Sequence, residues 1–143
     1  MTTVTLIQDR IYAINSTLAD VSAARTFNGQ PDSAILPLIV SVPGRSTRNT
    51  ARIGAGRDEQ TRTFRLILAV DAWMSGFPTE TAQLAAETLI DVIQDCYLAC
   101  PRLELNRAPL DGVSRVVLGD DTGIIPLGNF AVVEFPLSIT YFK

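Results

Sequence analysis

A stretch of strict two-residue alternation at residues 62–73 restricts the fold of this 143-residue chain more than any other feature. Apolar residues fill every second position there, and the positions between them are mixed in character. The two sets are Phe64, Leu66, Leu68, Val70 and Ala72, and Arg65, Ile67, Ala69, Asp71 and Trp73. Because successive side chains of a strand point to opposite faces, this pattern predicts a strand with one uniformly apolar face. Such a strand suits a sheet that has a helix on one side.

Two amphipathic stretches supply helices for that side. The first is preceded by a capping-box pair, Thr5 and Gln8, and predicts a helix over residues 5–24. Its apolar stripe is Ile7, Ile11, Ile14, Leu18 and Val21. The second predicted helix has Thr79 as its N-cap and runs to about Ala99. Its expected buried face comprises Ala82, Ala85, Ala86, Leu89, Val92, Ile93, Cys96 and Cys100.

Four more segments have strand character, and two of them contain proline. They are Ala34–Val42, Leu103–Leu105, Val113–Leu118 and Phe130–Phe142. Proline donates no hydrogen bond to a ladder, so Pro37 predicts an edge strand or bulge, and Pro136 predicts a bulge. The expected order is α-β-β-α-β-β-β. Short connections favour antiparallel pairing, so we predict one α+β domain over residues 1–143: a mostly antiparallel sheet with two helices packed on one face.

The segment at residues 43–61 (PGRSTRNTARIGAGRDEQT) is the least foldable part of the chain. It is rich in Gly, Ser, Thr and Arg and has one large aliphatic residue, Ile53, so burial cannot offset the cost of ordering it. Loops of this length are usually functional or mobile. We therefore predict an extended mobile arm here, at the tip of a long β-hairpin.

Composition argues against catalysis and against dedicated nucleic-acid binding. The chain has no histidine, which removes the commonest general base and the commonest transition-metal ligand. Its net charge of -3 lacks the basic balance of a nucleic-acid binder. No apolar run is long enough to cross a bilayer, and the first residues do not resemble a signal peptide. The expectations are a non-enzymatic protein with no cofactor, made and used in a cytoplasm.

Three motifs are weaker than they first look. Cys96 and Cys100 lie at helical i,i+4 spacing, but no third Cys or His completes a metal site, so buried packing is expected. Asp120 and Asp121 precede Thr-Gly, which indicates a turn and lacks the calcium-loop pattern. Residues 54–56 (Gly-Ala-Gly) lack the strand, Gly-Lys-Ser/Thr and helix of a phosphate loop.

The predicted arm and its neighbouring strand supply the candidate interface residues. Guanidinium groups pair bidentately with carboxylates, and tryptophan is enriched at binding hot spots. The candidates for contact with another subunit are Arg45, Arg48, Arg52, Arg57, Arg62 and Trp73. A solvated loop and nucleic-acid contact remain alternatives for the arginines, and core packing remains one for the tryptophan. The arm has no aromatic residue to stack on bases.

The order and texture of these segments resemble a known family. They are TLIQDRIYAINSTL, the outgoing strand RTFRLILAVDAWM, the acidic-capped helix PTETAQLAAETLIDVIQDC and the closing SITYF. The chain resembles the tail terminator, or tail-completion, proteins of long-tailed bacteriophages over nearly its whole length. The resemblance implies a homo-hexameric ring on the tail tube, which stops tube polymerisation and presents a docking surface to the head connector.

The same resemblance implies the partners and the location. They are other copies of the chain, a tail tube protein and a head–tail connector protein, in the neck of a virion assembled in the host cytoplasm, with DNA only passing through the ring lumen. Membrane contact is not expected. Other neck or head–tail joining subunits share these features and remain an alternative. A nucleic-acid-contacting module is a second alternative, and a small-molecule enzyme using Asp71, Glu80 or Glu134 is a third.

Overall fold

The computed structural model describes residues 3–19, 21–25, 37–48, 59–71, 73–74, 77–78, 80–127 and 130–142. Within these ranges the chain is an α+β protein with two helices and a mixed sheet, which confirms the predicted α+β class, whereas the predicted element order α-β-β-α-β-β-β is not confirmed. The elements are α1 (Val4–Asn15), β1 (Ser22–Arg25), β2 (Leu38–Arg48), β3 (Glu59–Asp71), β4 (Trp73–Met74), β5 (Phe77–Pro78), α2 (Glu80–Leu98), β6 (Val113–Leu118), β7 (Ile125–Leu127) and β8 (Phe130–Phe142).

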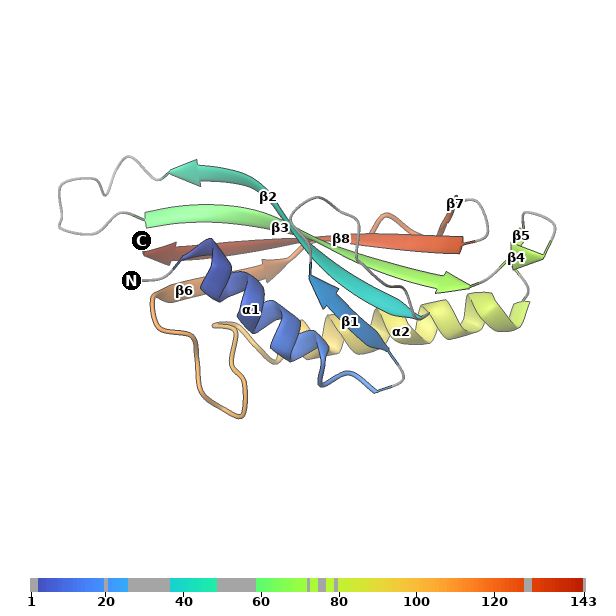
Figure 1. The fold of residues 1–143 in the computed structure, drawn as a ribbon, viewed down its shortest axis with the longest axis horizontal. Helices are drawn as coiled ribbons and strands as arrows, with labels where there is room; N and C mark the ends of the chain where they lie inside the picture. Colours follow the sequence, from blue (N-terminus) through green and yellow to red (C-terminus); the bar gives the residue numbers. More distant parts are fainter. Residues whose placement is uncertain are drawn as a thin grey trace.

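The main sheet is built around β3 and β8. Five strands follow the order β1-β2-β3-β8-β6, and β7 also pairs with β8 (Figure 1). β3 and β8 are antiparallel over their full lengths, from Glu59 opposite Phe142 to Asp71 opposite Phe130. β1 is parallel to β2, and the other pairs of this sheet are antiparallel. A separate pair is formed by β4 and β5.

Both helices lie against the same face of the sheet, and the core lies between them (Figure 1). The even-numbered apolar residues of β3 meet the odd-numbered residues of β8 across the ladder, so both sets point to the helices. Phe64, Leu66, Leu68, Phe135 and Leu137 are fully buried there. The alternation predicted for residues 62–73 is therefore confirmed at Phe64, Leu66, Leu68 and Val70.

The first helix is shorter than predicted. α1 ends at Asn15, although Ile7, Ile11, Ile14 and Leu18 are buried as expected. α1 ends in a tighter turn: the Ser16 amide and hydroxyl both donate to the Tyr12 carbonyl (2.9 and 2.8 Å), and the Thr17 amide and hydroxyl both donate to the Ile14 carbonyl three residues back (3.0 and 2.6 Å).

The residues assigned to the end of that helix form a strand. Ser22–Arg25 is β1, parallel to Leu38–Ser41. The helix cap also differs from the prediction: Thr3 is the N-cap, and its hydroxyl oxygen accepts from the Leu6 amide (3.2 Å). The Gln8 side chain is buried and donates to the Ser41 carbonyl (2.7 Å), so it helps to fix α1 on β2.

β2 differs from its prediction in position and extent. It begins at Leu38, directly after Pro37, and it lies between β1 and β3, so the expectation of an edge strand is wrong. The proline interrupts no ladder because it precedes the strand. β2 continues to Arg48, and β3 begins at Glu59, so residues 43–48 and 59–61 of the predicted arm belong to the sheet. The prediction of an arm then concerns residues 49–58, which lie outside the described residues.

Pro136 causes no bulge in the β3–β8 ladder, so that prediction is wrong. Its register with Arg65 is continuous with the neighbouring pairs. The Pro136 carbonyl accepts from the Gly119 amide (2.7 Å) where β6 has just ended, so the missing N–H faces a place with no ladder to continue. Gly119 is required there, because a Cβ at that position would lie 2.6 Å from the Pro136 Cγ.

The C-terminal strands match the sequence closely. β6 and β8 have the predicted bounds, Val113–Leu118 and Phe130–Phe142. The Asp121 carboxylate accepts from the Gly123 amide (2.9 Å), but the chain does not reverse there: β6 and β7 both run antiparallel to β8, so the prediction of a strand-connecting turn at Asp120–Gly123 is wrong. Two expectations fail: Leu105 makes only an isolated bridge with Ala108, and β7 had no prediction.

α2 covers nearly the predicted span but is rotated relative to the expected face. Ala86 and Ile93 are buried as predicted, whereas Val92 is 38% exposed. Ile90 and Tyr97 are buried in its place. The predicted face included Val92 because the alanines and cysteines were counted as buried. Small residues such as these fit on either side of a helix, so they do not define its buried face. Among the described residues, no helix has the length and apolarity to cross a bilayer.

Candidate subunit interface

The predicted interface residues lie in three separate places. Arg45 and Arg48 are exposed near the end of β2. Arg62 is in β3, and Trp73 is in β4, where it pairs with Pro78. Arg52 and Arg57 lie outside the described residues. The structure therefore brings Arg45 and Arg48 onto one strand end and places Trp73 in a different sheet.

A bulge in β2 positions Arg45. The register between β2 and β3 shifts between Pro43 and Ser46, so β2 carries one extra residue there. Gly44 packs directly on β3, because a Cβ at that position would lie 2.4 Å from the Thr63 carbonyl oxygen. Only glycine fits this approach, and the following residue, Arg45, is directed into solvent.

Arg62 belongs to the helix side of the sheet. It lies between Ser46 of β2 and Ile139 of β8 in the ladder, and Ile139 is fully buried. Its side chain is half-buried, and its Nε is buried without a hydrogen-bond partner. Arg62 is thus partly enclosed by its own chain, and it is less accessible to another subunit than Arg45 or Arg48.

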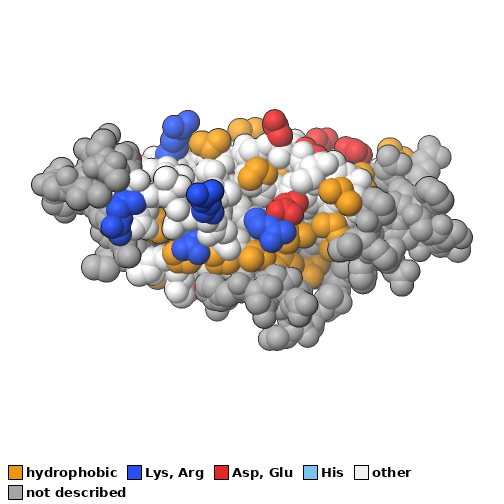
Figure 2. Space-filling view, turned by 90° about the horizontal axis from the view of Figure 1, so that it is seen from above, with side chains coloured by type: hydrophobic (Ala, Val, Ile, Leu, Met, Phe, Trp, Pro, Cys, Tyr) orange, Lys and Arg blue, Asp and Glu red, His pale blue; other side chains and the backbone are white. Residues whose placement is uncertain are grey.

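The outer face of the sheet, opposite the helices, mixes hydroxyl, charged and aliphatic side chains. Thr61 and Thr140 hydroxyls are 3.0 Å apart across the β3–β8 ladder, and those of Thr63 and Ser138 are 3.4 Å apart. At the β6 and β7 side of this face, Val117 is 42% exposed and Ile125 is 48% exposed. Figure 2 shows basic side chains gathered toward the end where β2 stops, and acidic ones toward the other end.

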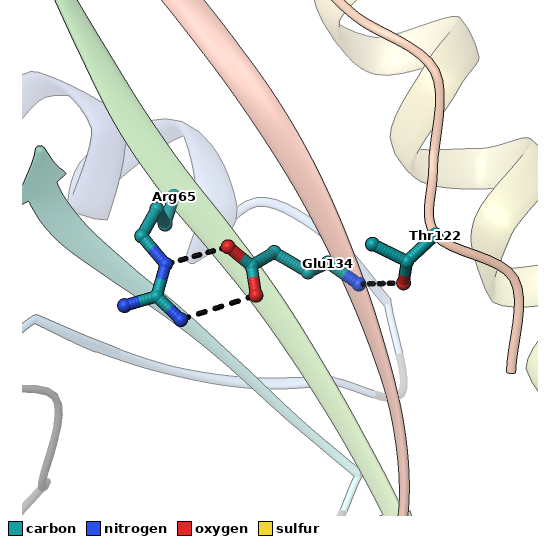
Figure 3. A network of polar contacts seen from close by, with 3 residues as sticks. All are labelled: Arg65, Thr122 and Glu134. Carbon is teal, nitrogen blue, oxygen red and sulfur yellow. Dashed lines mark hydrogen bonds and ion pairs between the residues drawn. The ribbon is translucent and has the colours of Figure 1, made fainter. Parts of the chain in front are cut away.

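An ion pair crosses the middle of the outer face (Figure 3). Arg65 Nε is 2.5 Å from Glu134 Oε1, and Arg65 Nη2 is 3.1 Å from Glu134 Oε2. This bidentate contact from Arg65 lowers the pKa of Glu134 and raises that of Arg65. The Glu134 amide also donates to the Thr122 hydroxyl (3.1 Å), which fixes the turn after β6 against β8. The pair needs the β3–β8 register, so no sequence pattern revealed it.

The solvent face of α2 is a second exposed surface. Glu87, Asp91 and Asp95 follow one another at i,i+4 spacing, so they form one row on the helix. All three are exposed, and no basic residue lies in the last turn of the helix. Leu84, Val92 and Leu98 on the same side are 62%, 38% and 76% exposed. The row was visible in the sequence at its helical spacing, although it was not among the predicted site residues.

The loop between α2 and β6 is held in place by two arginines. Arg10 Nη1 donates to the carbonyls of Leu103 (3.1 Å) and Ala108 (2.8 Å), and Arg102 Nε donates to the Val113 carbonyl (3.0 Å). Leu103, Asn106 and Arg107 have positive φ values of 53°, 53° and 68°. Such conformations are unfavourable for residues other than glycine, so these arginine contacts compensate for backbone strain.

The cysteine pair lies partly buried at the end of α2. Both thiols are half-buried, and the Cys100 Sγ contacts the Glu104 carbonyl (3.5 Å). Desolvation raises the pKa of the Cys96 thiol to about 11 and also raises that of Cys100. Protonated thiols are poor nucleophiles and poor metal ligands. Within the described ranges, no group of three or more His, Cys, Asp or Glu is placed to hold a metal ion.

Comparison with known proteins adds no relative to this description. No protein-family model matches the chain, and no curated protein matches it. Of the carboxylates considered for an enzyme, Glu134 is engaged by Arg65, Asp71 is the last residue of β3 and Glu80 is the first residue of α2. The surfaces that distinguish the molecule are the outer sheet face and the solvent face of α2.

Proposed function

We propose that this chain is a structural subunit of a long-tailed phage, similar in role to a tail terminator. It forms a homo-hexameric ring that caps the tail tube, stops tube polymerisation and presents a docking surface to the head connector. The chain acts without a cofactor and is not an enzyme. It works in the neck of the virion, after assembly in the host cytoplasm.

One observation carries this proposal: two different surfaces of the fold have exposed aliphatic side chains beside charged ones. The outer sheet face has Val117 and Ile125, and the solvent face of α2 has Leu84 and Leu98. A ring is closed by heterologous contacts, in which one patch of a subunit meets a different patch of the next. A chain with two distinct adhesive surfaces meets that requirement.

The arm prediction fits the same role. Arg45 and Arg48 lie in the last four residues of β2, and the sequence has two more arginines, Arg52 and Arg57, before β3. Arginines on a strand extension are suited to reach carboxylates of a neighbouring copy. Trp73 and Arg62 stay as further interface candidates within this proposal.

The test is the oligomeric state of the purified chain, measured by light scattering after size exclusion and by negative-stain imaging. The expected result is a ring, formed by the chain alone or on addition of the tube protein. A chain that stays monomeric at high concentration, also with tube protein present, refutes the proposal. Rings that bind connector but not tube indicate a neighbouring neck subunit instead.

A nucleic-acid contact is the second candidate, since exposed arginines gather at one end of the molecule. Binding of DNA would then weaken steeply with salt and vanish when Arg45, Arg48, Arg52 and Arg57 are changed to alanine. No mobility shift of DNA at low salt removes this candidate.

A further inference from the structure

The solvent face of α2 carries a row of negative charges that no basic residue of the described chain balances with an ion pair. Glu87, Asp91 and Asp95 stand one helical turn apart, so each carboxylate repels the next. Within the described part of the chain, none of the three makes an ion pair. Like charges at this spacing destabilise a helix by a few tenths of a kcal/mol per pair, so a cationic partner is favoured there.

Aliphatic side chains lie along the same face. Leu84, Asp91 and Leu98 are seven residues apart, which places them nearly in line along the helix. Leu84 and Leu98 are 62% and 76% exposed, and Val92 beside them is 38% exposed. The face therefore offers apolar area and negative charge together, and the core lies on the opposite side of the helix, at Ala86, Ile90, Ile93 and Tyr97.

The complementary charge is on the same chain but at the other end of it. Arg45 and Arg48 are exposed where β2 ends. Figure 1 shows that this strand end and the beginning of α2 lie at opposite ends of the long axis of the molecule. The beginning of the α2 face is therefore remote from the arginines of the same molecule (Figure 1).

We infer that the solvent face of α2 is the docking site for the Arg45–Arg48 end of β2 from a second copy of this chain. The contact is head-to-tail, because each copy contributes a different surface to it. It rests on the proposed ring, and it joins the α2 face to the end of β2 rather than to the outer sheet face. The guanidinium groups pair with the carboxylate row, and their aliphatic stems cover Leu84 and Leu98.

Charge reversal with a swap tests this contact. Arg45→Glu/Arg48→Glu and Glu87→Lys/Asp91→Lys are each expected to weaken self-association at least about tenfold, since attraction becomes repulsion at each site. Mixing the two variants pairs a wild-type face with a wild-type face, and a reversed face with a reversed face. The mixture is therefore expected to associate to within about threefold of wild type, as measured by sedimentation equilibrium.

A matched control changes one charge elsewhere. Arg107→Glu reverses an exposed arginine of the α2–β6 loop, away from the outer sheet face, and it is expected to leave association within about twofold of wild type, whereas the single variant Arg45→Glu weakens it more. Circular dichroism shows whether each variant keeps its fold. Wild-type association must also weaken between low and high salt.

The outcomes separate this inference from the proposed function. If wild type forms rings and the reversals leave them intact, the α2 contact is wrong and the ring stands. The same follows if the control weakens association as much as the reversals do, or if the mixture fails to restore it. If wild type never associates, alone or with tube protein, both proposals fail.

Discussion

The hydrogen bond between the two helices provides a sharp test of the core. Tyr97 of α2 donates its hydroxyl to the Asn15 Oδ1 at the end of α1 (2.6 Å). Tyr97 is 3% exposed and Asn15 is fully buried, and the Asn15 Nδ2 is buried without a hydrogen-bond partner. Tyr97→Phe would leave the whole side-chain amide unpaired inside the protein.

The magnitude follows from that burial. A buried polar group that loses its partner costs about 1–3 kcal/mol, whereas replacing both partners by apolar groups is close to neutral. Tyr97→Phe and Asn15→Leu are each expected to lower the free energy of unfolding by about 1–2 kcal/mol. The double variant Asn15→Leu/Tyr97→Phe is expected to lie within about 1 kcal/mol of wild type.

Urea unfolding followed by circular dichroism measures all four proteins of this cycle. Desolvation raises the pKa of Tyr97 well above its ordinary value, so the phenol stays neutral and the cycle is free of charge effects near neutral pH. A double variant that loses the sum of the two single losses would refute the reasoning. A Tyr97→Phe loss below about 0.5 kcal/mol would do the same.

Three other predictions concern backbone fit, pH and thiol chemistry. Gly44→Ala is expected to lower the free energy of unfolding by about 2 kcal/mol or more, measured by thermal unfolding, because the new Cβ would meet the Thr63 carbonyl. The control Ser46→Ala is expected to change it by no more than about 0.5 kcal/mol. Equal losses in the two variants would contradict the close approach of Gly44 to β3. Glu134→Gln is expected to cost at most about 1 kcal/mol at neutral pH, since the pair with Arg65 is partly exposed. The pKa of Glu134 is lowered in the folded state, so this contribution is full above the unfolded pKa of about 4.3 and is lost as the pH falls through the lowered folded value; a difference from wild type that persists in acid counts against the ion pair. Cys96 and Cys100 are expected to react with iodoacetamide at least about tenfold more slowly in the folded protein than in urea, and equal rates would show that the thiols are not desolvated.

The predictions from the sequence were most accurate for segments in which apolar residues follow a single clear period. β6 and β8 have the expected bounds, and the apolar side of β3 is as expected, since two-residue alternation leaves little choice of face. The prediction of a helix over residues 5–24 was wrong at β1, because Leu18 and Val21 continue the helical spacing of apolar residues after the helix has ended. The helix ends where the Thr17 amide donates to the Ile14 carbonyl, three residues back, and the Ser16 and Thr17 hydroxyls add bonds to the last carbonyls; the spacing of apolar residues does not show this.

The positions of the candidate site residues could be predicted less well, because they are set by pairing between strands that are far apart in the sequence. Arg45 and Arg48 are exposed as an interface would need, but Arg62 turns to the helix side because Ser46 and Ile139 flank it. The partner of Arg65 is a residue 69 positions away, fixed only by the ladder. The acidic row of α2 was readable at helical spacing. The inferred contact of this row with a second copy needed the fold, which places the end of β2, with Arg45 and Arg48, at the opposite end of the molecule from the beginning of α2 (Figure 1).

The position of β8 in the sheet has a consequence for how the chain is made. β8 is the last strand in the sequence, yet it lies between β3 and β6 in the sheet. Until β8 is made, β1, β2 and β3 can pair with one another, but one edge of β3 is open and β6 and β7 lack the strand they pair with. The main sheet is therefore completed only when β8 joins it, and a chain cut before β8 is expected to expose an unpaired edge of β3.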